Sequence, residues 1–187
     1  MRGRRHADDV GLFRHSERRS AYLFWRKHVV VPFGLTEQQF VTRYRRCLER
    51  ASREFIDSLQ RLFSLSVPSS VREAEVQIFL GEEVGLEVPS AWIYYQGENN
   101  RVDRSDQSIF PGRSMELSVN LEEMDEFDAE YFSSDAFPGT DLVANTIKAW
   151  LAECWWKAGG WSYPVPVKLW VHDGYGDGKP IELSEHR

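Results

Sequence analysis

The sequence predicts an α+β fold in which an antiparallel sheet of about four to five strands packs against two main helices. Three observations predict this. One stripe of apolar residues recurs every three to four positions between residues 36 and 64, and a second does so between 140 and 158. Several short segments alternate apolar and polar residues, which is the period of a strand with one buried face. Because three such segments follow the first helix directly, we expect an antiparallel meander there.

The first helix begins at a capping box. Thr36 and Gln39 form a T-x-x-Q pair, whose side chains satisfy free backbone donors at a helix start. Apolar residues then lie on one face, and arginines and acids lie on the other, so the apolar face is predicted to contact the core. The members of this face are Phe40, Tyr44, Cys47, Leu48, Ala51, Phe55, Leu59 and Leu62.

Five segments have the character of strands. Pro166 has no backbone N–H to give to a sheet, which predicts an edge position for its strand. The glycine-rich stretch between Asp173 and Gly178 predicts a turn, and a short return strand is expected after it. The predicted strands are residues 74–80, 91–95, 114–121, 165–171 and 180–183.

The second helix follows an acidic segment. Its start is assigned to Thr140 or Asp141 as the cap, and its end to the pair Gly159–Gly160, because glycine accepts the left-handed geometry of a helix C-terminus. The preceding residues 121–137 are acidic but carry turn-spaced Met124, Phe127, Tyr131 and Phe132. Both a short amphipathic helix and an ordered acidic loop fit this pattern.

The chain is interpreted as a flexible basic arm, residues 1–19, followed by a single α+β domain, residues 20–187. No apolar run reaches the length of a signal peptide core or a membrane span. The two cysteines, Cys47 and Cys154, form no C-x-x-C pair and are expected to be free buried thiols. We therefore expect a cytoplasmic protein without membrane association.

Charge is distributed unevenly along the chain. The net charge is −6, yet basic residues predominate in the first 61 positions and acidic residues in the rest. No Lys or Arg occurs between Ser114 and Ile147. Such asymmetry predicts an acidic face that attracts a protein with a basic surface, although acids that merely solvate the surface would give the same pattern. Nucleic acid is disfavoured as a partner, because phosphate-binding domains are usually basic overall.

Catalytic and metal-binding patterns are weak. His172 and Asp173, with Asp177 nearby, follow a predicted strand, where catalytic groups often lie. The same stretch faintly matches a calcium loop, but Tyr175 and Ser184 occupy ligand positions that require other side chains. No histidine spacing, nucleophile elbow, phosphate loop or dinucleotide motif is present. We therefore predict no catalytic residue, no metal and no cofactor, and keep a hydrolase using His172 and Asp173 as an alternative.

Aromatic residues gather near the end of the second helix. Trp155 and Trp156 are adjacent and cannot both face the same core, so one of them packs elsewhere or stays exposed. Core packing and an interface anchor both remain open for this cluster. It consists of Trp150, Trp155, Trp156, Trp161 and Tyr163.

The C-terminal part of the chain carries a family resemblance. The segment Ala149–Trp161 reads AWLAECWWKAGGW, and Lys168–Gly174 reads KLWVHDG. This pattern resembles small bacterial proteins of unassigned function, some of which sit beside secreted toxins as immunity proteins. The resemblance implies a cytosolic, acidic, non-catalytic protein that blocks a basic toxin by charge and shape.

These observations favour a non-catalytic binding protein of immunity or inhibitor type, which neutralises a basic toxin or effector through an acidic, aromatic-rich surface. A hydrolase, a structural subunit that assembles through the basic arm and the long helix, and a homodimer remain open. The predicted partner-binding residues are Glu122, Glu123, Asp125, Glu126, Asp128, Tyr131, Asp135, Trp156 and Trp161.

Overall fold

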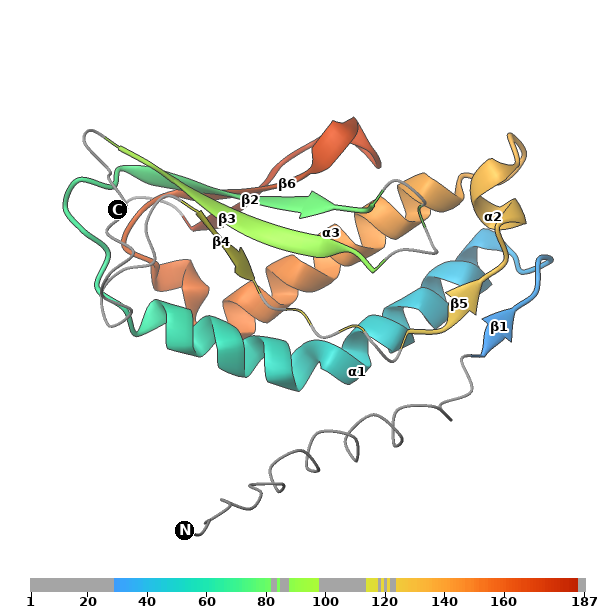
Figure 1. The fold of residues 1–187 in the computed structure, drawn as a ribbon, viewed down its shortest axis with the longest axis horizontal. Helices are drawn as coiled ribbons and strands as arrows, with labels where there is room; N and C mark the ends of the chain where they lie inside the picture. The colour runs from blue at the N-terminus through green and yellow to red at the C-terminus, as the bar shows by residue number, and fades with distance from the viewer. Residues whose placement is uncertain are drawn as a thin grey trace, which may run out of the picture.

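The computed structural model describes residues 29–81, 84, 88–97, 114–117, 119, 121 and 124–184. Two long helices, α1 and α3, lie on the same side of a five-stranded sheet (Figure 1). This confirms the predicted α+β class with two main helices. The predicted arm 1–19 lies outside the described residues, so the division into arm and domain stays a prediction.

Helix α1, Glu37–Phe63, begins at the predicted capping box. The Gln39 amide N–H donates to Thr36 Oγ1 at 3.3 Å, and the Thr36 amide N–H donates to Gln39 Oε1 at 3.0 Å. All eight residues of the predicted apolar face are buried, which confirms the period of this helix. Helix α1 packs against α3, so one long stripe serves both the second helix and the sheet.

The large sheet has the strand order β4-β3-β2-β6-β7. The first three strands form the expected antiparallel meander, but β6 pairs parallel with β2, so the sheet is mixed rather than wholly antiparallel. The reason is that α3 carries the chain across the sheet, and a helical crossover returns a strand in parallel. The strands are β2 Glu73–Phe79, β3 Ser90–Gln96, β4 Ser114–Leu117, β6 Val167–Val171 and β7 Ile181–Ser184.

Pro166 does not mark an edge strand, which corrects a second expectation. Strand β6 lies between β2 and β7, and it begins one residue after the proline. The carbonyl of Pro166 still accepts a hydrogen bond from the Ala74 amide at 2.9 Å. A proline is tolerated here because the ladder uses only its acceptor.

Helix α3, Gly139–Lys157, has a different start from the predicted one. Pro138 is the N-cap and makes no side-chain cap bond, so neither Thr140 nor Asp141 caps the helix. The end is as predicted, because Gly159 follows the C-cap with φ +94°. A short 3-10 helix, η1, Gly160–Ser162, comes next.

The described part of the acidic segment forms a short strand and one helical turn, so neither a helix nor a loop alone describes it. Strand β5, Glu126–Phe127, pairs parallel with β1, Val30–Val31, and helix α2, Glu130–Ser133, follows. An aromatic cluster holds this unit on the first turns of α1. Ring centroids of Phe127, Tyr131 and Phe137 lie 4.8, 5.0 and 5.4 Å from that of Phe40.

The core lies between the two helices and one face of the sheet. On that face every side chain of β2 and β3 that points to the helices is buried, including Val76, Ile78 and Ile93. Trp150 and Trp155 of α3 are fully buried, and the Trp150 ring stacks on Phe55 at 5.2 Å. None of the described helices is both long and apolar enough to cross a bilayer.

Candidate partner-binding surface

The charge of Asp125 is used inside the molecule. Its carboxylate is only 12% exposed and accepts a hydrogen bond from Arg43 Nε at 2.9 Å. Arg50 Nη2 donates to the other carboxylate oxygen at 3.2 Å. Both arginines come from α1, so Asp125 ties the acidic segment to that helix. Glu122 and Glu123, which were predicted beside it, lie outside the described residues.

The free thiols are built into the same helix pair. Cys47 and Cys154 are buried and unpaired, as expected. Burial raises the pKa of the Cys47 thiol, and burial likewise raises that of Cys154. Since the thiolate is the reactive form, both cysteines are suited to packing and not to nucleophilic chemistry.

Tyr131 is a structural residue and not a contact residue. Its side chain has no exposed area. The hydroxyl donates to the carbonyl of Pro32 at 2.7 Å and accepts from the amide of Leu35 at 2.9 Å. These bonds fix the chain that enters α1 against α2. The prediction of Tyr131 as a partner anchor is corrected, because its turn-spaced position points into the core.

The remaining described acids of the segment differ in their availability. Asp128 Oδ1 accepts a hydrogen bond from the Glu130 amide at 3.0 Å, which supports the first turn of α2. Glu126 and Asp135 are exposed, and neither carboxylate makes an ion pair or hydrogen bond within the described ranges. The acidic segment therefore offers a partner fewer free charges than its sequence implies.

The two exposed tryptophans lie far from the acids. Trp156 is 41% exposed and its Nε1 donates to the carbonyl of Leu183 at 3.0 Å, while Trp161 is 62% exposed. Trp156 lies in the last turn of α3 and Trp161 follows in η1, whereas the acidic segment precedes the N-terminal end of α3 (Figure 1). At 1.5 Å per residue, about 25 Å of helix separates them. Those predicted residues that the structure describes consequently do not form one surface.

The other face of the sheet carries a row of half-buried aromatic side chains that are not among the predicted partner-binding residues. Trp92 of β3 and Trp170 of β6 are both register partners of Gln77, which lies between them on β2. Tyr94 follows Trp92 on the same face, two residues along β3. Neither long helix covers this face (Figure 1). We call the residues Trp92, Tyr94, Trp170, Gln77, Glu75, Glu116 and Lys168 the open sheet face.

Acids alternate with the rings on the open sheet face. Glu116 of β4 is directly opposite Trp92, and Glu75 of β2 is directly opposite Tyr94. Lys168 is also a register partner of Glu75, and its Nζ lies 3.8 Å from a carboxylate oxygen of Glu182 on β7. The side chains named here include three carboxylates and one ammonium group, so the face is both aromatic and negative.

The sequence contained a signal for this face. In β3 and β6 the positions between buried residues hold Trp92, Tyr94 and Trp170 instead of small polar side chains. A strand with one solvated face normally alternates apolar and polar residues, so large rings on both faces indicate that the second face has a use. The sequence did not show that Trp92 and Trp170 would align. Their alignment requires β6 to pair with β2, and that pairing depends on the crossover through α3.

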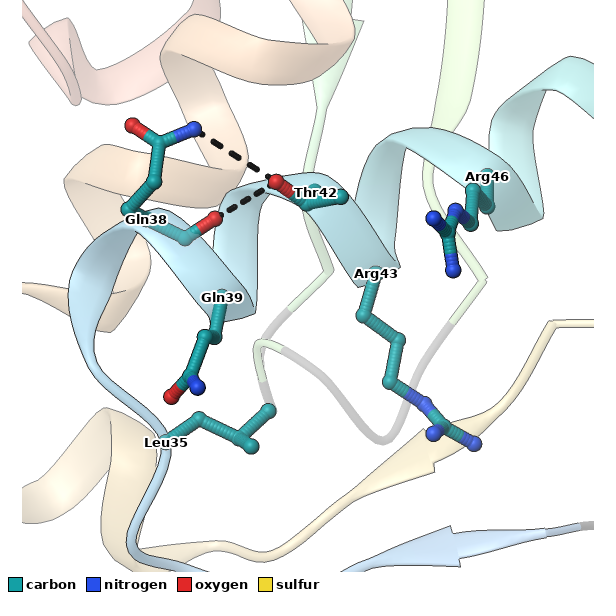
Figure 2. Close-up of a pocket in the computed structure, with 6 residues that line it drawn as sticks. All are labelled: Leu35, Gln38, Gln39, Thr42, Arg43 and Arg46. Carbon is teal, nitrogen blue, oxygen red and sulfur yellow. Dashed lines mark hydrogen bonds between the residues drawn. The ribbon is translucent and has the colours of Figure 1, made fainter.

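A surface depression lies over the first turns of α1, with a volume of about 310 Å³. Figure 2 shows that Gln38 and Thr42 are joined by hydrogen bonds, while Arg43 points toward β5, where it meets Asp125. The depression holds amide, hydroxyl and guanidinium groups but no carboxylate, histidine or thiol for acid–base or nucleophilic chemistry. It is lined by Leu35, Gln38, Gln39, Thr42, Arg43 and Arg46.

No protein-family model, curated protein or solved structure matches the chain. The resemblance of the C-terminal segment to immunity-type proteins therefore stays a prediction.

The residues of the hydrolase alternative are not assembled into a site. His172 Nε2 lies 3.5 Å from Asp173 Oδ1, and both side chains are about half exposed or more. Asp177 instead pairs with Lys148 of α3, and the hydrogen bond from that ammonium lowers the pKa of the Asp177 carboxyl. Among the described residues there is no group of three metal-ligating side chains.

The turn after β6 is clasped to α3 by successive polar residues on one helix face. Asp141 accepts from the Gly176 amide at 2.7 Å, and Asn145 accepts from the Asp177 amide at 3.0 Å. Lys148, whose side chain is 5% exposed, also donates to the carbonyl of Lys179 at 2.8 Å. Asp141 thus serves the turn and not the helix cap, and the predicted glycine-rich turn is a rigid element.

Proposed function

We propose that this chain is a non-catalytic binding protein that contacts a protein partner through the open sheet face. The observation that carries the proposal is the alignment of Trp92 and Trp170 on either side of Gln77. Strands lie about 4.8 Å apart, so the two indoles stand on backbone positions about 10 Å from each other. This spacing suits a side chain or short segment of a partner inserted between them.

Physical reasons favour binding over other uses of the face. Tryptophan and tyrosine give large contact areas at low cost in conformational entropy, and they are enriched among the residues that dominate binding energy. Here they stand on a rigid sheet whose opposite face is fully packed, so little ordering is needed on association. The indole N–H groups of Trp92 and Trp170 have no acceptor in the described part of the chain and can donate to a partner.

The finer proposal concerns the class of partner. The net charge of −6 and the acids on the open sheet face favour a partner with a basic surface. An immunity or inhibitor protein that blocks a basic toxin or effector in the cytoplasm has this character. The C-terminal resemblance supports the same class.

The test is capture of a partner from native lysate at low and high salt, using the wild-type chain and two variants as bait. Trp92→Ala/Trp170→Ala removes both indole rings of the open sheet face. Trp161→Ala, in η1 after the C-terminal end of α3, is the matched control. We expect the double variant to lose a captured protein that the control retains, with all baits showing equal thermal midpoints. If the double variant retains the protein and the Trp161→Ala control loses it, the binding site lies at Trp161 and not on the open sheet face.

Size-exclusion chromatography with light scattering tests whether the chain forms a homodimer. If the wild-type chain dimerises and Trp92→Ala/Trp170→Ala is monomeric, then the partner of the open sheet face is a second copy. The proposal of a basic heterologous partner would then be wrong.

A further inference from the structure

We infer that the open sheet face recognises arginine side chains of its partner. This inference rests on the proposed binding function and names the ligand chemistry of the same surface. It places recognition on the sheet and not on the acidic segment around β5 and α2.

The first step is the row that runs across β4, β3, β2 and β6. The strand pairing puts Glu116 opposite Trp92, Trp92 opposite Gln77, and Gln77 opposite Trp170. Directly opposite residues have Cβ atoms about 5 Å apart. A carboxylate, an aromatic ring and an amide therefore lie side by side in one line, and the ring and the carboxylate are close enough for one guanidinium group to contact both.

The second step is the chemistry of that line. A guanidinium group stacks on an aromatic face through attraction to the ring electrons, and it forms paired hydrogen bonds with a carboxylate. Trp92 with Glu116 offers both interactions to one group, and Tyr94 with Glu75 repeats the combination. A lysine ammonium lacks the planar shape for stacking and pairing at once, so arginine is favoured over lysine.

The third step is the charge balance. Lys168 is the basic residue of the face, and it is engaged by Glu182. Glu75 and Glu116 make no ion pair or hydrogen bond with any described side chain, so they are available to a cation. The negative balance repels phosphate, which excludes nucleic acid in spite of the exposed rings. In contrast, Asp125 of the acidic segment already binds two arginines of this chain.

The experiment is calorimetric titration of the full chain with three capped hexapeptides, of arginine, of lysine and of glutamate, and with a single-stranded hexanucleotide. We expect the arginine peptide to bind about threefold or more tighter than the lysine peptide. No heat is expected from the glutamate peptide or the hexanucleotide. Binding of the hexanucleotide at the same face would overturn the inference.

Matched variants locate the binding. Glu75→Gln/Glu116→Gln is expected to lower the affinity for the arginine peptide about tenfold, and Trp92→Ala is expected to lower it by the same factor. The control Glu126→Gln/Asp135→Gln removes an equal charge from the acidic segment and should change affinity by less than about twofold. The inference is wrong if the control weakens binding and the sheet variants do not, or if all variants bind alike.

The two proposals fail separately. If the native partner is lost with Trp92→Ala/Trp170→Ala but the arginine peptide binds without regard to Glu75 and Glu116, the binding function stands and its arginine chemistry is wrong. If neither the partner nor the peptide depends on the sheet residues, both proposals are wrong.

Discussion

Arg43 Nε donates to Asp125 Oδ2 at 2.9 Å, and the same arginine's Nη2 lies 2.8 Å from that oxygen. This contact joins the second turn of α1 to the residue before β5. Through this contact the acidic segment, which its sequence predicts to be a free surface, packs against α1. The neighbouring residues Asp125 and Glu126 allow the structural and the surface roles of carboxylates in this unit to be separated.

Asp125→Asn is expected to destabilise the protein by about 2 kcal/mol, because two guanidinium groups lose a charged acceptor at a site that is only 12% exposed. Urea unfolding of the purified chain measures the change. The matched variant is Glu126→Gln, which alters an exposed neighbour and should stay within about 0.5 kcal/mol of the wild type. Equal midpoints for the two variants would show that Asp125 is not a structural carboxylate.

Tyr131→Phe is expected to lower the free energy of unfolding by about 1–2 kcal/mol, because the carbonyl of Pro32 and the amide of Leu35 lose their partner at a fully buried side chain. Thermal or urea unfolding provides the measurement. Tyr94→Phe serves as the control, because within the described residues its hydroxyl makes no hydrogen bond. That variant should be neutral to within about 0.5 kcal/mol.

Gly176→Ala should disturb the clasped turn more than Gly178→Ala. Both glycines have positive φ, so each alanine pays the cost of a left-handed backbone, about 1 kcal/mol. At Gly176 the new Cβ would also lie 2.5 Å from Asn145 Oδ1 and 3.2 Å from the Ala144 Cβ. Asn145 must then rotate away and release the Asp177 amide, which adds about 1 kcal/mol.

Hydrogen exchange of the Asp177 amide reports this directly. We expect faster exchange in Gly176→Ala and a rate near that of the wild type in Gly178→Ala. The same rate in both variants would mean that Asn145 does not hold the turn.

The Arg45–Glu153 contact, 2.5 Å between Nη2 and Oε2, should make a small pH-dependent contribution. The hydrogen bond from Arg45 lowers the pKa of Glu153 in the folded protein. A depressed carboxyl pKa stabilises the fold above the ordinary pKa of glutamate, and this contribution is lost as pH falls through the lowered pKa.

Glu153→Gln is therefore expected to cost about 0.5 kcal/mol at neutral pH, since the side chain is 41% exposed and solvent screens the pair. The difference from the wild type should shrink as the pH is lowered to about 3. Urea unfolding at a series of pH values measures it. A difference that stays constant across the series would assign the effect to packing and not to charge.

Local patterns in the chain accounted for much of the fold. The capping box at Thr36, the eight-residue apolar face of α1 and the glycine at the end of α3 were correct, because each depends on neighbours within one or two turns. The cap of α3 was wrong for the opposite reason. Asp141 has the chemistry of a cap, but a turn more than thirty residues away takes its carboxylate.

The candidate site was less predictable than the fold. Counting acids along residues 122–135 could not show that Asp125 meets Arg43 and Arg50, which lie more than seventy positions earlier. Turn spacing placed Tyr131 correctly on an apolar face but did not say that the face was the core. Trp156 and Trp161 were predicted as partner contacts and are exposed, but their distance from the acids followed only from the direction of α3.

The sequence by itself determined the α+β class, the two helices, the strand segments and an overall negative charge, since periodicity and composition act locally. The tertiary structure decided which charges remain free and which rings share a face. The free charges depend on the contact of Asp125 with α1. The alignment of the rings depends on β6 pairing with β2 through the α3 crossover, a long-range choice made by burial of the whole apolar surface. That pairing aligns Trp92, Gln77 and Trp170, and no local pattern specifies it.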